Sequence, residues 1–166
     1  MKLKYIVRSQ TMKMITEGIF NSVLVYCLPL FGGCDKGELQ AIQVLQNKAA
    51  QIVTRSAPRS HRDTMYDTLG WLTVNQLVVY HTAITVYRIR QSNEPEYLAE
   101  KLQFDSRNGR VIVPNLKLGL ARRSFCFRGA DTWNSLPMHV RQARKIGEFK
   151  KGVRKWVQGN VARFLP

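Results

Sequence analysis

The segment from Thr73 to about Ser92 constrains the fold most, because its apolar residues recur at helical spacing over a wide face. These residues are Val74, Leu77, Val78, Ile84 and Ile89. A face this wide stays out of water only when several other helices cover it. The sequence therefore predicts a helical bundle with residues 73–92 at its centre.

Helical patterns also cover residues 12–31, 38–54, about 61–69 and 95–102, each with a glycine or proline at or near one end. Basic residues up to Lys13 precede an apolar stretch from Ile19 to Phe31, which loosely imitates a signal peptide, but Glu17, Gly18 and Asn21 interrupt it. The run is also too short and too polar for a membrane span, which needs about 20 mostly apolar residues. We expect a buried helix here and no membrane partner.

The helix expected over residues 38–54 has two distinct faces. The face expected to lie against the core holds Leu39, Ile42, Leu45, Ala49, Ile52 and Val53. The face expected to point outward holds Gln40, Gln43, Asn47, Lys48 and Gln51. Asp35 lies just before the helix and has a side chain suited to capping its N-terminus.

The pattern changes after residue 106. Asn108-Gly109 is a turn signal and Val111-Ile112-Val113 follows it, while residues 123–128 alternate as in a half-buried strand. These features favour a short hairpin or a pair of irregular extended segments. Residues 146–157 return to an amphipathic helix with the apolar stripe Ile146, Phe149, Val153, Trp156 and Val157. The predicted fold is mainly α: a small helical bundle with a basic C-terminal extension that ends in this helix.

The charge is concentrated in that extension. Residues 107–166 hold 14 Lys/Arg against Asp131 and Glu148, a net charge of +12, whereas residues 1–106 carry a net charge of only +3. We therefore expect a helical bundle over 1–106 and a basic extension over 107–166 packed on it. A charge this one-sided points to a region that meets an anionic partner, above all a phosphate backbone.

Catalytic and metal-binding patterns are missing from the sequence. There is no glycine-rich phosphate loop and no adjacent pair of acidic residues of the kind that a two-metal polymerase uses. Asp63 and Asp67 are spaced to share a helix face, and a solvated face explains them better than a metal. The three cysteines fit neither a disulfide framework nor a zinc knuckle. We expect no enzyme, no cofactor and an intracellular protein, nuclear or cytoplasmic.

The candidate contacts to nucleic acid are basic residues of the extension. They are Arg107, Arg110, Lys117, Arg122, Arg123, Arg128, Arg141, Arg144, Lys145, Lys150, Lys151, Arg154 and Lys155. Phe125 and Phe127 interleave with some of these cations, as in proteins that stack bases of a single strand, although both rings are also expected of a core. No base-reading motif is present, so binding is expected to be electrostatic and mostly independent of sequence.

Three motifs resemble the segment that follows the catalytic domain in reverse transcriptases of non-LTR (LINE-type) retrotransposons. One is the run from Val25 to Gly33, which is similar to the end of the first thumb helix. The second is Leu45-Gln46-Asn47-Lys48-Ala49 within the next helix. The third and most specific runs from Arg123 through Trp133-Asn134-Ser135-Leu136-Pro137 and is followed by Phe149-Lys150.

The resemblance implies a helical thumb that grips a template–primer duplex, plus an extension that helps to hold RNA. The family's catalytic aspartates and endonuclease are expected upstream of Met1, so the chain resembles a non-catalytic fragment. RNA, an RNA–DNA hybrid and single-stranded DNA are all admissible partners. Within the third motif we expect Trp133 to anchor the extension to the bundle, Asn134 to cap and Pro137 to start a helix.

The alternative function is association with another protein or with a second copy of the chain. A fragment without its polymerase exposes the apolar surface that once packed against it. A bare apolar face on the helix of residues 12–31 favours this alternative. Arg and Lys side chains that gather on one face favour nucleic acid.

Overall fold

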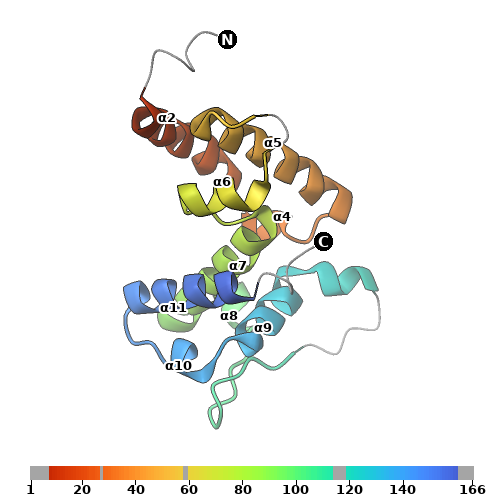
Figure 1. The fold of residues 1–166 in the computed structure, drawn as a ribbon. Helices are drawn as coiled ribbons and strands as arrows, with labels where there is room; N and C mark the ends of the chain where they lie inside the picture. The colour runs from red at the N-terminus through yellow and green to blue at the C-terminus, as the bar shows by residue number, and fades with distance from the viewer. Residues whose placement is uncertain (1–7, 27, 58–59, 114–118, 161–166) are drawn as a thin grey trace. The chain divides into compact units, whose positions relative to one another are not determined.

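The computed structural model describes residues 8–26, 28–57, 60–113 and 119–160, and these residues contain helices and no β-strand. The prediction of a helical bundle is confirmed. The described residues fall into two compact units, whose helices can be followed by residue number in Figure 1. Unit 1 holds residues 8–26 and 35–77, and unit 2 holds residues 28–34 and 78–160. None of the helices described is long and apolar enough to cross a membrane.

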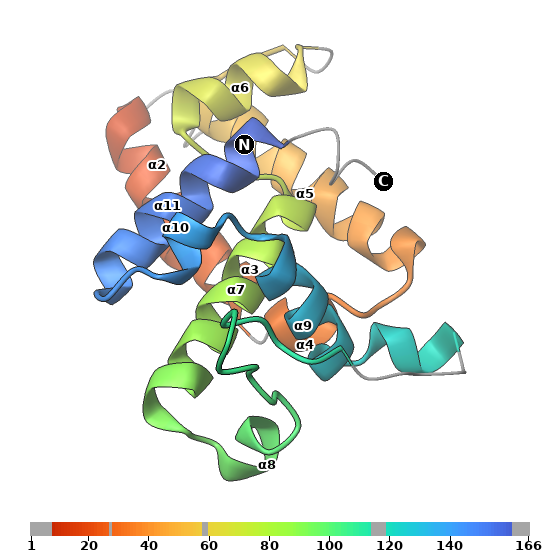
Figure 2. The same ribbon diagram turned by 90° about the horizontal axis from the view of Figure 1, so that it is seen from below.

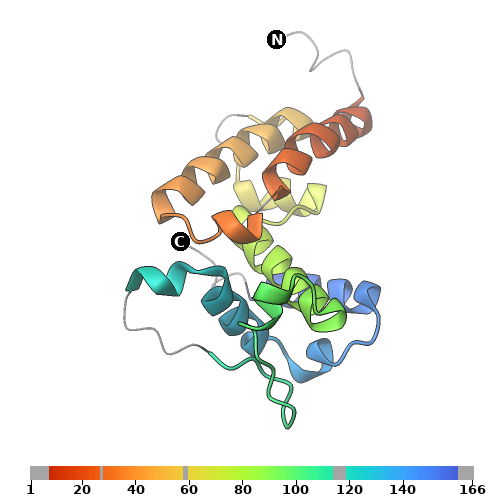
Figure 3. The same ribbon diagram turned by 180° about the vertical axis from the view of Figure 1, so that it is seen from behind.

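Unit 1 is built around the helix α5 (Lys36–Thr54). The helices α2 (Ser9–Thr16) and α6 (Arg62–Leu69) both lie against α5, as Figures 1 and 3 show. The core of this unit comprises Ala49, Ala50, Val53, Met65, Tyr66, Leu69 and Trp71. Asp35 caps α5 as expected, because its carboxylate accepts from the N–H of Gly37 while Glu38 accepts from the N–H of Asp35.

The single buried helix expected over residues 12–31 is broken in the structure, and no residue from Ser9 to Val25 is buried, so the expectation of burial is wrong as well. After α2 the chain forms a π-helical turn, η1 (Glu17–Asn21), then a short helix α3 (Ser22–Val25), and the helical conformation ends at Tyr26. The Ser22 hydroxyl donates to the carbonyls of Gly18 and Ile19, at 2.6 and 3.0 Å. Such side-chain bonds to the preceding turn compete with the regular backbone pattern and bend helices.

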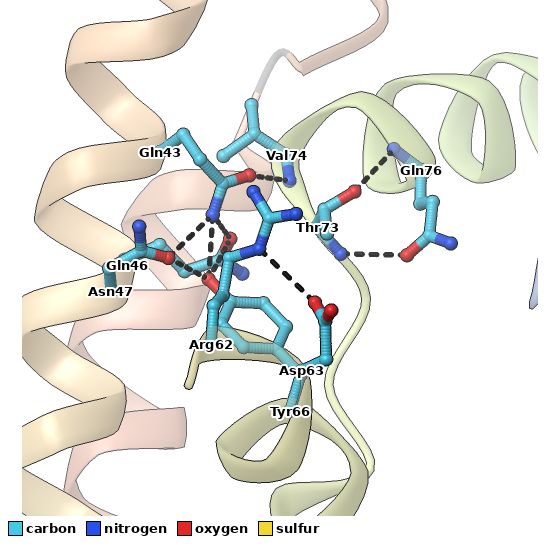
Figure 4. Close-up of polar contacts among 9 residues, drawn as sticks. All are labelled: Gln43, Gln46, Asn47, Arg62, Asp63, Tyr66, Thr73, Val74 and Gln76. Carbon is cyan, nitrogen blue, oxygen red and sulfur yellow. Dashed lines mark hydrogen bonds and ion pairs between the residues drawn. The ribbon is translucent and has the colours of Figure 1, made fainter. Parts of the chain in front are cut away.

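The expectation that Gln43 points outward is wrong. Gln43 and Gln46 are buried, whereas Leu45 of the expected core face is 54% exposed. Figure 4 shows the reason. Gln43 donates to the Tyr66 hydroxyl (2.7 Å) and accepts from the backbone N–H of Val74 (2.9 Å), the first residue of α7 (Val74–Ser92). The amide of Gln46 donates to the Leu72 carbonyl at 3.0 Å. Two glutamines of α5 therefore satisfy backbone groups at the start of α7.

Replacing Gln43 with leucine is expected to lower the free energy of unfolding by about 1–3 kcal/mol, the cost of leaving the buried Val74 N–H without an acceptor. Urea unfolding followed by circular dichroism measures the change. Gln40→Leu is the matched control, because Gln40 lies on the same helix and is exposed. Equal stability of the two variants would show that the Val74 N–H does not depend on Gln43.

Unit 2 packs α7 beyond Leu77 against α9 (Phe125–Ser135) and α11 (Ile146–Gly159). Smaller elements complete it: α4 (Leu28–Phe31), α8 (Glu96–Ala99), the 3-10 helix η2 (Gly119–Arg123) and α10 (Met138–Arg141). Figure 2 shows α9 beside α7. The two helices approach closely at Gly129, where an added Cβ would stand 3.0 Å from a methyl of Val86. The core is formed by Ala83, Ile84, Val86, Tyr87, Ile89, Leu102, Val111, Ala130, Trp133, Leu136, Val140, Phe149, Val153 and Val157.

The strand predicted for residues 123–128 is wrong, because helix α9 begins inside that range. Ser124 caps it by accepting from the N–H of Phe127 at 3.4 Å. Alternation over six residues is too short to separate a strand from a helix. The longer pattern was helical, since Phe125, Gly129 and Trp133 recur every four residues on the face that meets the core.

The turn at Asn108-Gly109 is present, but the expected hairpin strands are not among the residues that the structure describes. Phe104 and Val111 form one isolated antiparallel bridge, and Gly109 has a φ of 62°, which suits glycine. Backbone bonds join the two sides of the turn, from the Asp105 N–H to the Arg110 carbonyl and from the Ile112 N–H to the Gln103 carbonyl, each at 2.8 Å. Asn134 also bonds to Val111. Its amide oxygen accepts from the Val111 N–H at 2.9 Å, and its amide nitrogen donates to the Val111 carbonyl at 2.7 Å. The expectation that Asn134 caps a helix is therefore wrong.

The terminal amphipathic helix is confirmed as α11. Phe149, Val153 and Val157 are fully buried. Ile146, also expected in the apolar stripe, is 38% exposed, because it is the first residue of the helix. On the opposite face Lys151, Arg154 and Lys155 are exposed, as predicted.

Candidate nucleic-acid interface

Three arginines from distant parts of the sequence meet in unit 2, and we refer to Arg90, Arg110 and Arg141 as the arginine cluster. Arg90 lies in the last turns of α7, Arg110 follows the Asn108-Gly109 turn, and Arg141 ends α10. The guanidinium of Arg90 donates to the backbone carbonyl of Arg141 at 3.2 Å. The guanidinium of Arg141 in turn donates to the carbonyl of Asn108, at 3.4 Å. These bonds hold the cluster together.

Aromatic rings and carbonyls fix the position of each guanidinium. The Arg90 guanidinium carbon lies 5.5 Å from the ring centroids of both Phe104 and Trp133, a cation–π arrangement. Arg141 also donates through Nε to the carbonyl of Leu136 at 3.2 Å, and Arg110 donates to the carbonyl of Asn134 at 3.5 Å. Carbonyl partners orient a guanidinium without neutralising its charge.

The arginine cluster has no acidic counterpart. None of its members forms an ion pair with a carboxylate in the part of the chain that the structure describes. The carboxylate of Asp105, in the same loop, accepts instead from the Arg107 N–H and the Asn108 amide, at 2.9 and 2.8 Å. Burial, then Arg110 and Arg90, lower the pKa of Arg141. Like charges held together without a partner favour an added anion.

A second group of cations lies where α7 meets α11. Burial, then Lys150 and Arg88, lower the pKa of His81. The Tyr80 hydroxyl has a raised pKa because of burial, and Arg154 acts in the opposite direction. Lys150 and Arg154 of α11 therefore lie within electrostatic range of residues of α7, and the exposed Lys151 and Lys155 belong to the same helix.

The other predicted contacts are distributed more widely. Arg107, Arg144 and Lys145 are exposed, as are Arg122 and Arg123 in η2. Lys117 lies outside the described residues.

Arg128 differs from the other candidates, because it is half-buried and its guanidinium bonds to carbonyls within unit 2. Nε donates to the Arg123 carbonyl at 3.0 Å, and Nη2 donates to the carbonyls of Pro29 and Leu30. Burial lowers its pKa. Three hydrogen bonds of Arg128 therefore go to the protein itself, which leaves fewer of its donors for a phosphate.

The prediction from sequence missed Arg88 and Arg90. Both belong to α7, whose apolar pattern identified it only as a central helix. Arg90 and Arg141 are 51 residues apart, so no local motif connects them. The only local indication of a site was the pair of arginines in the last turns of α7. Cations are common at this end of a helix because they interact favourably with the helix dipole, so the pair did not point to a binding site.

The aromatic residues between the basic residues have separate places. Phe125 packs against the core of unit 2, as the alternative interpretation held, whereas Phe127 lies beside a pocket described below. No group of three His, Cys, Asp or Glu side chains suited to a metal ion occurs in the residues described.

Comparison with known proteins found no match: no protein-family model, no curated protein and no solved structure is similar enough to this chain.

Proposed function

We propose that this chain is a non-catalytic nucleic-acid-binding module that holds RNA or an RNA–DNA duplex through phosphate contacts. The observation that carries the proposal is the arginine cluster, in which three fixed guanidinium groups lie together and form no ion pair with a carboxylate of the described residues. A guanidinium donates two parallel hydrogen bonds to a phosphate and keeps its charge at any physiological pH. A backbone phosphate would supply the anion that this cluster lacks.

The lysines and arginines of α11 extend the proposed surface. Lys151, Arg154 and Lys155 lie on the face of α11 away from the core, and they belong to the same unit as the cluster. Such contacts position a nucleic acid without reading its bases. The mechanism is electrostatic, and the resemblance of the chain to the segment that follows the catalytic domain in retrotransposon reverse transcriptases is consistent with a duplex or hybrid as the partner.

Binding of labelled RNA to the purified chain over a salt series tests this function. If six to ten cations contact phosphates, affinity is expected to fall by about 10³–10⁵ between 50 and 200 mM salt. An affinity that hardly changes over this range would contradict a phosphate-based mechanism.

A second candidate function, self-association, is favoured by the surface of unit 1. Apolar side chains along α2, η1 and α3 are exposed: Met14 by 64%, Ile15 by 46%, Ile19 by 68%, Val23 by 74% and Tyr26 by 75%. Soluble monomers rarely expose a contiguous patch of this kind, and such patches attract partners or a second copy.

Val23→Lys is expected to shift a dimer of this chain towards monomer, because it places a charge in the exposed apolar patch. Sedimentation velocity at several micromolar concentrations measures the change. Gln10→Lys is the matched control, since Gln10 is exposed on α2 and the added charge is the same. An unmodified chain that is monomeric at every concentration would remove this candidate.

A further inference from the structure

Unit 2 contains a pocket of about 270 Å³ whose walls come from three helices. Thr82 of α7, Phe127, Asp131 and Thr132 of α9, and Trp156 of α11 all line it. Pockets for drug-sized ligands have volumes of about 300–1,000 Å³, so this one suits a single ring-sized group.

Three polar side chains on these walls have no hydrogen-bond or ion-pair partner among the residues that the structure describes. The Thr82 hydroxyl is buried and makes no hydrogen bond, and Thr82 as a whole is only 1% exposed. Asp131 and Thr132 make no side-chain hydrogen bond or ion pair with any residue described. Most buried polar groups in proteins are satisfied, so a buried hydroxyl without a partner calls for an explanation.

The absence of a partner for Asp131 is unusual in a segment this basic. Arg128 lines the same pocket, but its guanidinium is bonded to the carbonyls of Arg123, Pro29 and Leu30. Asp131 is exposed, and its carboxylate accepts no hydrogen bond from the described part of the chain. It is therefore available to accept from a donor that enters from outside.

The remaining wall residues define the shape of the ligand. Phe127 and Trp156 are half-buried aromatic side chains, and Val78 and Val79 of α7 add apolar surface. Aromatic walls contact flat rings well, and every nucleobase has a flat π-face. A carboxylate beside such walls selects a ring that carries an N–H donor.

We propose that this pocket binds one unstacked nucleobase that carries an exocyclic amino group. The amino group donates to Asp131, the hydroxyls of Thr82 and Thr132 lie along the ring edge, and Phe127 and Trp156 contact its faces. Uracil has an oxygen where cytosine has the amino group, so uracil would place that oxygen beside the carboxylate. This inference rests on the proposed binding of nucleic acid and adds a base preference to it.

Oligocytidine and oligouridine of equal length, measured at one salt concentration, separate the base contact from the phosphate contacts. Both strands carry the same charge, so the phosphate contacts of the arginine cluster should contribute equally to the two affinities. We expect oligocytidine to bind about tenfold more tightly, the effect of one charge-assisted hydrogen bond of about 1.4 kcal/mol. Free cytidine and uridine monophosphates, titrated while the Trp156 indole resonance is followed by NMR, test the pocket without a strand.

Thr82→Val and Asp131→Asn are the variants that test the residues. Thr82→Val removes a hydroxyl that has no partner, so folding is expected to be unaffected or stabilised. Both variants should bring the cytidine-to-uridine ratio close to one and leave oligouridine binding intact or, for Asp131→Asn, slightly stronger. Thr85→Val is the control on the same helix, because the Thr85 hydroxyl bonds to the His81 carbonyl at 2.9 Å and does not line the pocket.

The outcomes separate this proposal from the proposed function. Equal binding of the two strands, with no shift of Trp156 by either monophosphate, overturns the base pocket even if both strands bind strongly. A shift of the Trp156 resonance by cytidine monophosphate, with none by uridine monophosphate, supports the base pocket. Failure of both strands to bind would contradict phosphate-based binding, but it would not contradict the pocket if this shift is still observed. A tenfold preference that survives both substitutions places the base elsewhere and also overturns the proposal.

Discussion

Trp133→Ala is expected to lower the free energy of unfolding by about 3–5 kcal/mol, because it empties the centre of unit 2. The side chain is fully buried. Its ring centroid lies 5.7 Å from those of Phe104 and Phe149, edge-on to the first and stacked on the second. Its indole N–H donates to the Gly109 carbonyl at 2.9 Å, which fixes the loop that carries Arg110.

Two measurements check the role of Trp133 as an anchor. Urea unfolding gives the stability, and Trp133→Phe is the matched variant that keeps a ring but loses the bond to Gly109. We expect Trp133→Phe to lose less stability than Trp133→Ala, since most of the bulk remains. If Trp133→Ala instead lost binding of nucleic acid with no loss of stability, the residue would be a contact and not an anchor.

Replacing all three members of the arginine cluster with glutamine is expected to weaken RNA binding by about a hundredfold or more at low salt. Each lost phosphate contact should also reduce the slope of log K against log salt by about one unit, so the slope falls by about three. Fluorescence anisotropy with labelled RNA over a salt series measures both quantities. The Arg→Lys triple variant keeps the charge but loses the paired donors, so it should keep most of the slope and lose part of the affinity.

The control for charge alone replaces three exposed cations of unit 1, Arg8, Lys36 and Lys48, with glutamine. This variant has the same net charge as the cluster variant. We expect it to bind RNA almost as the unmodified chain does. Equal loss of affinity in the two triple variants would mean that net charge, and not the cluster, attracts the nucleic acid.

The parts of the fold that local patterns specify were predicted from the sequence. The Asp35 cap of α5, the apolar central helix α7 and the amphipathic α11 all depend on residues within a few positions of one another. The strand expected at residues 123–128 was wrong because six alternating residues fit both the period of a strand and that of a helix. Only the longer pattern, up to Trp133, distinguishes the helix from the strand.

The features that the sequence did not predict come from tertiary contacts. Gln43 is polar and lies on a helix surface, so an outward position was the natural expectation. It is buried because the N–H of Val74, 31 residues away, needs an acceptor. Arg90 also belongs to the candidate site because of a contact between distant residues, its hydrogen bond to the carbonyl of Arg141. The charge distribution also led us to expect residues 107–166 as an extension separate from residues 1–106. In the structure the described part of that segment belongs to the same compact unit as residues 78–106.

Whether the chain holds nucleic acid through phosphates is best measured by the binding of the unmodified chain across a salt series. The partners are duplex RNA, an RNA–DNA hybrid and single-stranded DNA of matched length. We expect binding with a slope of log K against log salt equivalent to several released ions. A folded chain that binds none of the three at low salt would contradict it, and would leave the exposed apolar face of unit 1 as the functional surface to pursue.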